Sequence, residues 1–105
     1  MEKRVVITGL GAITPVGIGK ENFYNALLEG KSGIGPITRF DASDYATRIA
    51  GEVKDFDITQ YGVDKKEARR MDRSVEFAIG AAVLAADDAK LALDEEDLDR
   101  CGTVV

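Results

Sequence analysis

Histidine is absent from the 105-residue sequence, and cysteine occurs once, as Cys101. Because histidine is the usual general base near neutral pH and the commonest metal ligand, several familiar kinds of active site are excluded. A zinc cluster or a Cys/His nucleophile pair cannot be assembled from this chain alone. A single cysteine also excludes an internal disulfide and fits a reducing, cytoplasmic compartment.

Long apolar runs are also missing. The longest, Phe77–Ala86, is interrupted by Gly80 and is well short of the roughly 20 residues that span a membrane. Near the amino terminus, only Val5–Ile7 is strongly apolar before Thr8, whereas a secretory signal needs roughly 7 to 15 such residues. Acidic side chains outnumber basic ones by 19 to 14. A general nucleic-acid or membrane-surface role is therefore disfavoured.

The most distinctive stretch is Val5–Gly19, which reads VVITGLGAITPVGIG. Three β-branched residues followed by several glycines predict a buried strand at Val5–Ile7 and then a long glycine-rich turn. Glycine has no Cβ, so its backbone can lie close to another group. That group is either a phosphate or another part of the protein.

A dinucleotide-binding loop is one interpretation of Gly9 and Gly11. Its third glycine should follow three residues after the second, where this chain has Thr14, and the next predicted helix begins only after Gly19. The Walker phosphate loop requires a Gly-Lys-Ser/Thr close, which is missing. The acidic run Asp94–Asp99 lacks the pattern of a calcium loop and predicts a solvated surface. We therefore expect neither a cofactor nor a metal, and the nucleotide interpretation is the least favoured.

Two segments have the residue periodicity of helices. The first covers Lys20–Glu29 and should end at Gly30, and the second runs from Asp72 or Ser74 to about Leu91. The second is apolar or small on nearly every side, which predicts burial on all sides and contact with neighbours beyond this chain.

The other segments predict little regular structure. We expect loop at Lys31–Phe40, an edge strand at Ile49–Val53, and coil with Phe56 and Ile58 directed inward. Cys101–Val105 predicts a second strand, parallel to the first, and the sequence stops within it. Residues 1–105 are thus expected to form a partial α/β domain, truncated in a strand.

A basic segment follows Asp64. The spacing of Asp64 and Glu67 matches a capping box and predicts a helical turn. The cations of this turn are Lys65, Lys66, Arg69 and Arg70, of which the last three share one helical face by their spacing. Spacing alone favours a solvated face, and the alternative is a docking patch for an acidic partner.

Four stretches resemble, in order, the β-ketoacyl-acyl carrier protein synthases. They are VVITGLGAITPVG from 5, LLEGKSGIGPITRFD from 27, YATRIAGEVKDFD from 45 and KKEARRMDRSVEFAIGAA from 65. The resemblance covers essentially the whole chain and is closer to the synthase II type than to synthase I. It implies a thiolase-like α/β fold with two similar layered halves, in a homodimer. This chain would be the first part of the amino-terminal half, about a quarter of the enzyme.

The resemblance also implies an activity, which is decarboxylative Claisen condensation of an acyl thioester with malonyl-acyl carrier protein in fatty acid elongation. The family's catalytic cysteine and two histidines come later, so no catalytic residue is expected here and the chain alone should be inactive. Cys101 follows an acidic run, unlike an activated nucleophile, and is expected to be structural.

The basic segment gains a role from the same resemblance. The family's cationic surface docks the acidic acyl carrier protein, and the matching positions are Lys65, Lys66, Arg69 and Arg70. Two alternatives stay open beside the fatty acid synthase: a non-catalytic ketosynthase-like subunit that pairs with a catalytic chain, and a polyketide ketosynthase.

Overall fold

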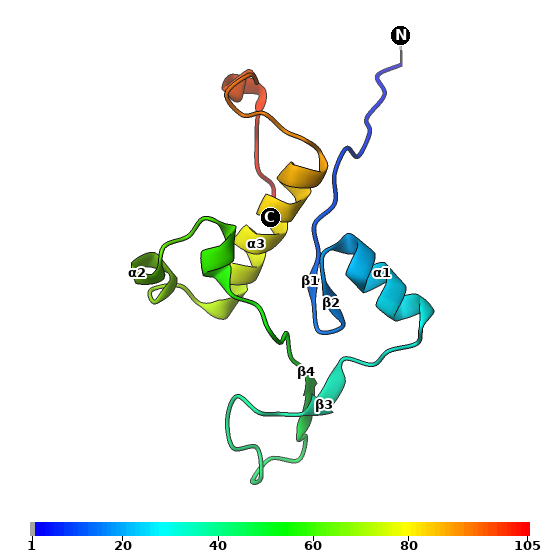
Figure 1. Cartoon of the computed structure of the whole chain (residues 1–105), viewed down its shortest axis with the longest axis vertical. Helices are drawn as coiled ribbons and strands as arrows, with labels where there is room; N and C mark the ends of the chain where they lie inside the picture. The colour runs from blue at the N-terminus through cyan, green and yellow to red at the C-terminus, as the bar shows by residue number, and fades with distance from the viewer. Residues whose placement is uncertain (1) are drawn as a thin grey trace.

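The computed structural model describes residues 2–105, which form three α-helices, two 3-10 turns and four short strands (Figure 1). The helices are α1 (Lys20–Leu28), α2 (Lys65–Ala68) and α3 (Arg73–Asp88), and the 3-10 turns are η1 (Ile58–Tyr61) and η2 (Leu98–Arg100). The strands are β1 (Ile13–Thr14), β2 (Gly17–Ile18), β3 (Ile34–Pro36) and β4 (Ile49–Gly51). Among the helices of residues 2–105, none has the length and apolar character needed to cross a membrane.

The predicted helices are confirmed, with boundaries set by their caps. α1 ends where Gly30 adopts a φ of 70°, a left-handed conformation that suits glycine, and the Glu29 amide donates to the Asn25 carbonyl at 3.0 Å. α3 begins after Asp72, whose extended backbone marks the N-cap. Periodicity and glycine placement were therefore sufficient to locate both helices.

The predicted parallel pair of strands is not formed within residues 2–105. Val5 and Ile7 are 94% and 83% exposed and lie in irregular backbone, as does Cys101–Val105. A strand needs a neighbour for its backbone hydrogen bonds, and no other segment among residues 2–105 supplies one here. The two ladders present are antiparallel: β1 with β2, inside the predicted turn, and β3 with β4. β3 also corrects the expectation of loop at Lys31–Phe40.

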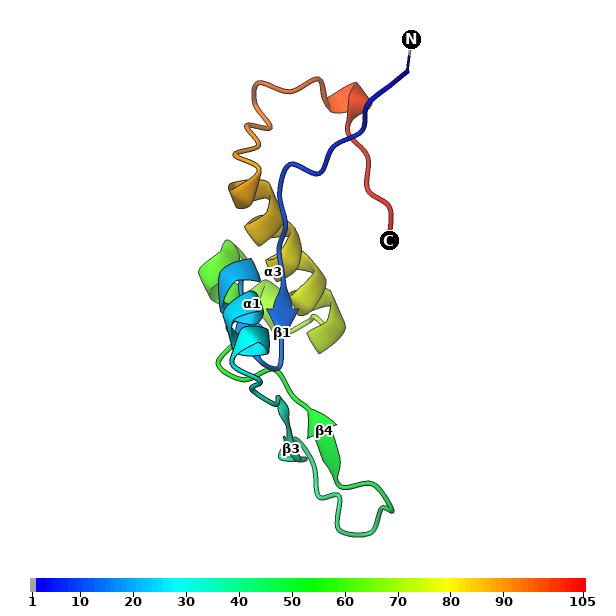
Figure 2. The same cartoon turned by 90° about the vertical axis from the view of Figure 1, so that its right-hand side faces the viewer.

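Helix α3 packs against β1 and η1. In Figure 1, α1 and α2 lie on opposite sides of it, and Figure 2 shows the amino-terminal segment running along it. Only Gly80 of α3 is buried, and Val75 is 44% exposed. The neighbours of α3 within residues 2–105 cover only part of its circumference, so the predicted burial on all sides is not reached within this part of the chain.

The chain leaves much of its apolar surface uncovered. Its buried hydrophobic residues are Ala26, Ala42, Phe56 and Ile58, which confirms the inward placement of Phe56 and Ile58. The accessible surface is 8896 Å², against roughly 5,700 Å² for a compact protein of 11.3 kDa. The radius of gyration is 17.2 Å, against about 13 Å for a compact domain of this length. The fold is open, with faces available to further protein.

Candidate functional site

The glycine-rich segment is the first candidate site, and its surroundings identify its role. A Cβ added to Gly11 would collide with the Ala81 carbonyl oxygen and lie 2.7 Å from the Ala85 nitrogen. A Cβ on Gly9 would lie 2.6 Å from the Ala89 nitrogen. The backbone of α3 therefore occupies the space beside both glycines. This contradicts the nucleotide interpretation and confirms close protein packing.

The basic segment, residues 64–70, is the second candidate. The Asp64 carboxylate accepts a hydrogen bond from the Glu67 amide at 2.8 Å, so the predicted N-cap of α2 is confirmed. The Arg69 amide donates to the Lys65 carbonyl at 3.3 Å, and the Arg70 amide then donates to Glu67 at 3.0 Å. Regular helix ends at Ala68, and the turn tightens through Arg70.

All the cations of the basic segment are exposed, namely Lys65, Lys66, Arg69 and Arg70. The ion pairs among residues 2–105 join Lys20 to Asp88, Lys31 to Glu29 and Arg73 to Glu76. Within that described part of the chain, the four cations are thus not neutralised by a paired carboxylate. Exposed, unneutralised charges attract an oppositely charged surface at distances up to about a Debye length, roughly 8 to 10 Å.

The segment before α2 supplies its anchor. The centroid of the Phe56 ring lies 5.5 Å from that of the Phe77 ring of α3 and 5.3 Å from that of the Tyr61 ring of η1. Gly80 of α3 admits this ring, since an added Cβ would lie 2.7 Å from Phe56 Cζ. Ile58 beside it is 3% exposed. In contrast, α2 itself contributes no buried side chain. The basic segment therefore depends on the residues that flank it.

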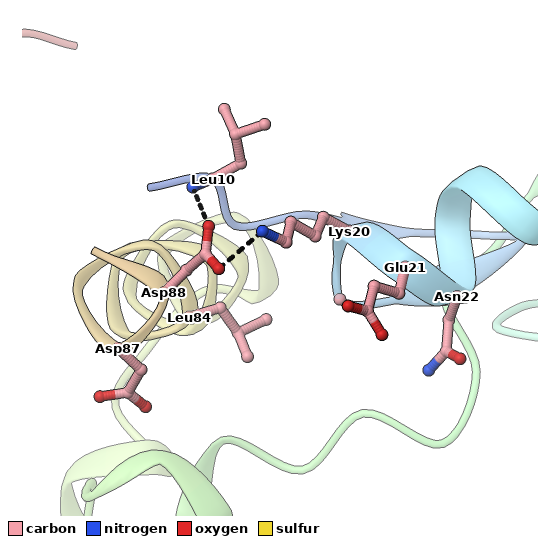
Figure 3. A pocket seen from close by; sticks show the side chains of 8 residues that line it. Leu10, Lys20, Glu21, Asn22, Leu84, Asp87 and Asp88 are labelled. Atoms are coloured by element: carbon pink, nitrogen blue, oxygen red, sulfur yellow. Dashed lines mark hydrogen bonds and ion pairs between the residues drawn. The ribbon is translucent and has the colours of Figure 1, made fainter. Parts of the chain in front are cut away.

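A cleft of 410 Å³ lies between the start of α1 and the end of α3 (Figure 3). Asp88 closes one side, accepting from the Leu10 amide at 2.9 Å and from Lys20 Nζ at 2.6 Å. The Lys20 hydrogen bond, followed by the Leu10 amide, lowers the pKa of Asp88 below its ordinary value of 3.8. Both carboxylate oxygens are thus bonded to other parts of the chain, so the role of Asp88 is structural: it joins Leu10 and Lys20 to the end of α3. We call this arrangement the Asp88 clasp. Sequence reasoning missed it, since the partners are 68 and 78 residues away.

Cys101 lies apart from these features. Its thiol is exposed and donates a hydrogen bond of 3.5 Å to the Asp97 carbonyl. The 3-10 turn η2 directly precedes it, and Leu98 of that turn is 62% exposed. Within residues 2–105, no group of three or more His, Cys, Asp or Glu side chains is arranged to hold a metal ion.

Comparison with known proteins gives a consistent result. Residues 2–105 match the family model described as "Beta-ketoacyl synthase, N-terminal domain". The chain is 56% identical over 104 residues to 3-oxoacyl-(acyl-carrier-protein) synthase 2 of Synechocystis sp., covering 99% of this chain and 25% of that protein. It is 47% identical over 104 residues to the protein of the same name from Vibrio harveyi, with the same coverage of 99% and 25%. The chain thus spans about a quarter of the curated relatives it matches.

Similarity in structure points the same way. The solved structure titled "The ishigamide ketosynthase/chain length factor" matches with a TM-score of 0.74 and 38% identity, covering 86% of this chain and 22% of that one. These matches confirm the resemblance and the thiolase-like α/β fold expected from the sequence. The chain therefore belongs to the beta-ketoacyl synthase family, whose N-terminal domain model it matches over residues 2–105.

Proposed function

We propose that this chain is part of a 3-oxoacyl-acyl carrier protein synthase that elongates fatty acids by decarboxylative Claisen condensation. The observation that carries the proposal is the 56% identity to a synthase of that name across 99% of the chain. In the proposed reaction, the acyl group is first bound as a thioester to an enzyme cysteine. Malonyl-acyl carrier protein loses CO₂, and the resulting carbanion attacks the acyl carbonyl, releasing the cysteine thiol and forming 3-oxoacyl-acyl carrier protein.

The reacting groups of this proposal lie outside residues 1–105. The sequence contains no histidine, and its one cysteine is the exposed Cys101. We propose that the remainder of the synthase supplies the cysteine nucleophile and two histidines, so this chain alone is inactive. The open faces of the chain, including Val5 and Val6, would then be covered by that remainder in a homodimer. A cytoplasmic location belongs to the same proposal.

The chain's own contribution, in this proposal, is a docking face for acyl carrier protein. Its residues are Lys65, Lys66, Arg69 and Arg70, which are all exposed. An acidic carrier protein approaching these cations gains a favourable interaction before contact, which raises the rate of productive encounter. The energy arises from solvated charges, so added salt should weaken it.

Charge reversal in the complete protein tests this function. Lys66→Glu with Arg69→Glu should raise KM for the carrier-linked substrate about tenfold at low salt, within the range of electrostatic steering. The KM of a carrier-free acyl thioester should not change. Because the attraction is removed, KM of the variant should also depend less on salt than the KM of the parent.

A matched control carries the same change of charge elsewhere. Lys31→Glu with Arg39→Glu reverses two exposed cations outside the basic segment. Lys31 pairs with Glu29 at 2.9 Å, but exposed pairs of this kind contribute little stability. If the control and the Lys66/Arg69 variant change KM equally, or neither changes it, the docking function is wrong.

A second candidate function is a non-catalytic ketosynthase-like subunit that pairs with a catalytic chain, or a polyketide ketosynthase. The similarity to the ishigamide ketosynthase/chain length factor, at 38% identity, supports it. The higher identity to synthases of fatty acid type, 47% to 56% in two relatives, favours the first proposal. The sequence after Val105 separates the non-catalytic subunit from a catalytic synthase, because a later cysteine with two histidines indicates catalysis and their loss indicates a partner subunit.

A further inference from the structure

Arg73 follows the basic segment but differs from its cations in being held by the protein. Its guanidinium carbon lies 4.9 Å from the centroid of the Phe77 ring and 5.6 Å from that of Phe56. Its Nη1 donates to Glu76 Oε2 at 3.2 Å, and its side chain is 30% exposed. A guanidinium placed against two aromatic faces and a carboxylate is fixed in orientation.

The same guanidinium reaches back across the chain. Nη2 donates to the Val53 carbonyl at 3.2 Å, and Nη1 donates to the Phe56 carbonyl at 3.3 Å. These acceptors precede the basic segment by sequence, whereas Arg73 follows it. One side chain therefore joins the two ends of segment 57–72, which carries η1 and α2.

The helix itself does not explain an arginine at this position. Arg73 is the first residue of α3, where a positive charge opposes the helix dipole. Its Nε is buried without a hydrogen-bond partner among residues 2–105, which carries a further cost. The compensating interactions are the two carbonyls, the two rings and Glu76. Arg73 therefore stabilises the join between the irregular segment 53–56 and α3 rather than α3 alone.

The basic segment has little else to hold it. α2 has four residues and no buried side chain, and it projects from α3 on the side away from α1 (Figure 1). Its orientation is therefore set at its two ends. One end rests on Phe56 and Ile58, and the other on Asp72 and Arg73. A shift of either end relative to α3 would reorient α2 and so move all the cations of the basic segment together.

We propose that Arg73 is a positioning residue that orients the basic segment for its docking partner. This inference rests on the proposed docking function and adds a residue that takes no direct part in contact with the carrier. Lysine does not replace it, because a single ammonium lacks the planar fork that bonds two carbonyls and stacks on two rings. The cation that sets the geometry is thus distinct from the cations that meet the partner.

The test uses the complete enzyme and measures KM and kcat with two substrates. Arg73→Lys should raise KM for the carrier-linked substrate about fivefold, a change on the scale of the coupling between contacting groups. Neither kcat nor the KM of a carrier-free acyl thioester should change. Arg73→Gln, which removes the charge but keeps most of the stem, should give the same pattern. Val75→Ala, at an exposed position of α3, is the control and should leave KM unchanged.

A second background shows whether Arg73 acts through the cations. When Lys66 and Arg69 are already Glu, the segment has lost its attraction for an acidic partner, so Arg73→Lys should have no further effect on KM. An equal effect in both backgrounds, or a fall in kcat with both substrates, would show a purely structural role and overturn the inference. If Lys66→Glu with Arg69→Glu raises KM but Arg73→Lys does not, docking stands and this inference fails. If neither changes KM, the docking function itself fails.

Discussion

A single added methyl group tests the account of the glycine-rich segment. In Gly11→Ala, the new Cβ would point at the backbone of α3, against the Ala81 carbonyl oxygen and 2.7 Å from the Ala85 nitrogen. Favourable contacts between heavy atoms need about 3.5 to 4.0 Å. Because both obstacles are backbone atoms of a regular helix, neither can rotate away, and the amino-terminal segment must move as a unit.

The size of the effect follows from this geometry. Overpacking of this kind costs typically 1 to 3 kcal/mol, and a backbone obstacle places Gly11→Ala toward the upper end of about 3 kcal/mol. Replacing glycine by alanine also stiffens the unfolded chain, which contributes about 0.4 to 1 kcal/mol in the opposite direction. Gly35→Ala shares this second term but has nothing within 4 Å of its added Cβ. The difference between the two variants therefore isolates the clash.

The assay is thermal unfolding of the complete protein, followed by circular dichroism. Gly11→Ala should lower the unfolding midpoint by a few degrees relative to Gly35→Ala, since each kcal/mol corresponds to about 1 °C in a protein of roughly 400 residues, the length of a relative of which this chain covers 25%. Gly9→Ala should behave like Gly11→Ala, because its Cβ would lie 2.6 Å from the Ala89 nitrogen. Midpoints that agree for Gly11→Ala and Gly35→Ala would refute the packing role.

Three further predictions concern the clasp, the cap and the open surface. Ionised Asp88, with its pKa held below 3.8 by Lys20 and then by the Leu10 amide, stabilises the fold above pH 3.8 and loses that contribution as the pH falls through the lowered pKa. Asp88→Asn should therefore lower the unfolding midpoint at neutral pH, and a difference from the parent that persists in acid would contradict this. Asp64→Ala removes the N-cap of α2 and should raise KM for the carrier-linked substrate, whereas Asp64→Asn, which can still accept from Glu67, should not. The isolated 105-residue chain exposes 8896 Å² and should self-associate or unfold readily; a monomer by sedimentation with one cooperative thermal transition would count against this.

Local signals in the sequence were sufficient for the helices and their ends. Gly30 ends α1, Asp72 begins α3, and Asp64 caps α2, and each position follows from the conformation or hydrogen bond that the residue type favours. The basic segment was found in the same way, because its cations are close in sequence. Its proposed role comes from the resemblance, since spacing alone favours a solvated face.

Contacts between distant segments could not be predicted. The strand at Val5–Ile7 needs a neighbouring strand, and the pairing of β3 with β4 joins segments separated by a loop. The Asp88 clasp depends on the Leu10 amide, and the Arg73 fork on the Val53 and Phe56 carbonyls. Every residue has a backbone carbonyl and nearly every residue a backbone amide, so the sequence does not indicate which of them a distant side chain will bond. The small residues of α3 permit close approach, but they do not indicate that Gly9 and Gly11 are the residues that lie against them.

The proposed activity is tested most directly by supplying the complete protein with an acyl thioester and malonyl-acyl carrier protein and measuring both products. We expect 3-oxoacyl-acyl carrier protein and CO₂ in equal amounts, with a KM for the carrier-linked substrate that rises in Lys66→Glu with Arg69→Glu. Absence of condensation in the complete protein, under conditions in which a relative such as the Synechocystis sp. synthase is active, would contradict the proposed enzyme. Condensation with a KM unaffected by that charge reversal would contradict the role of the basic segment.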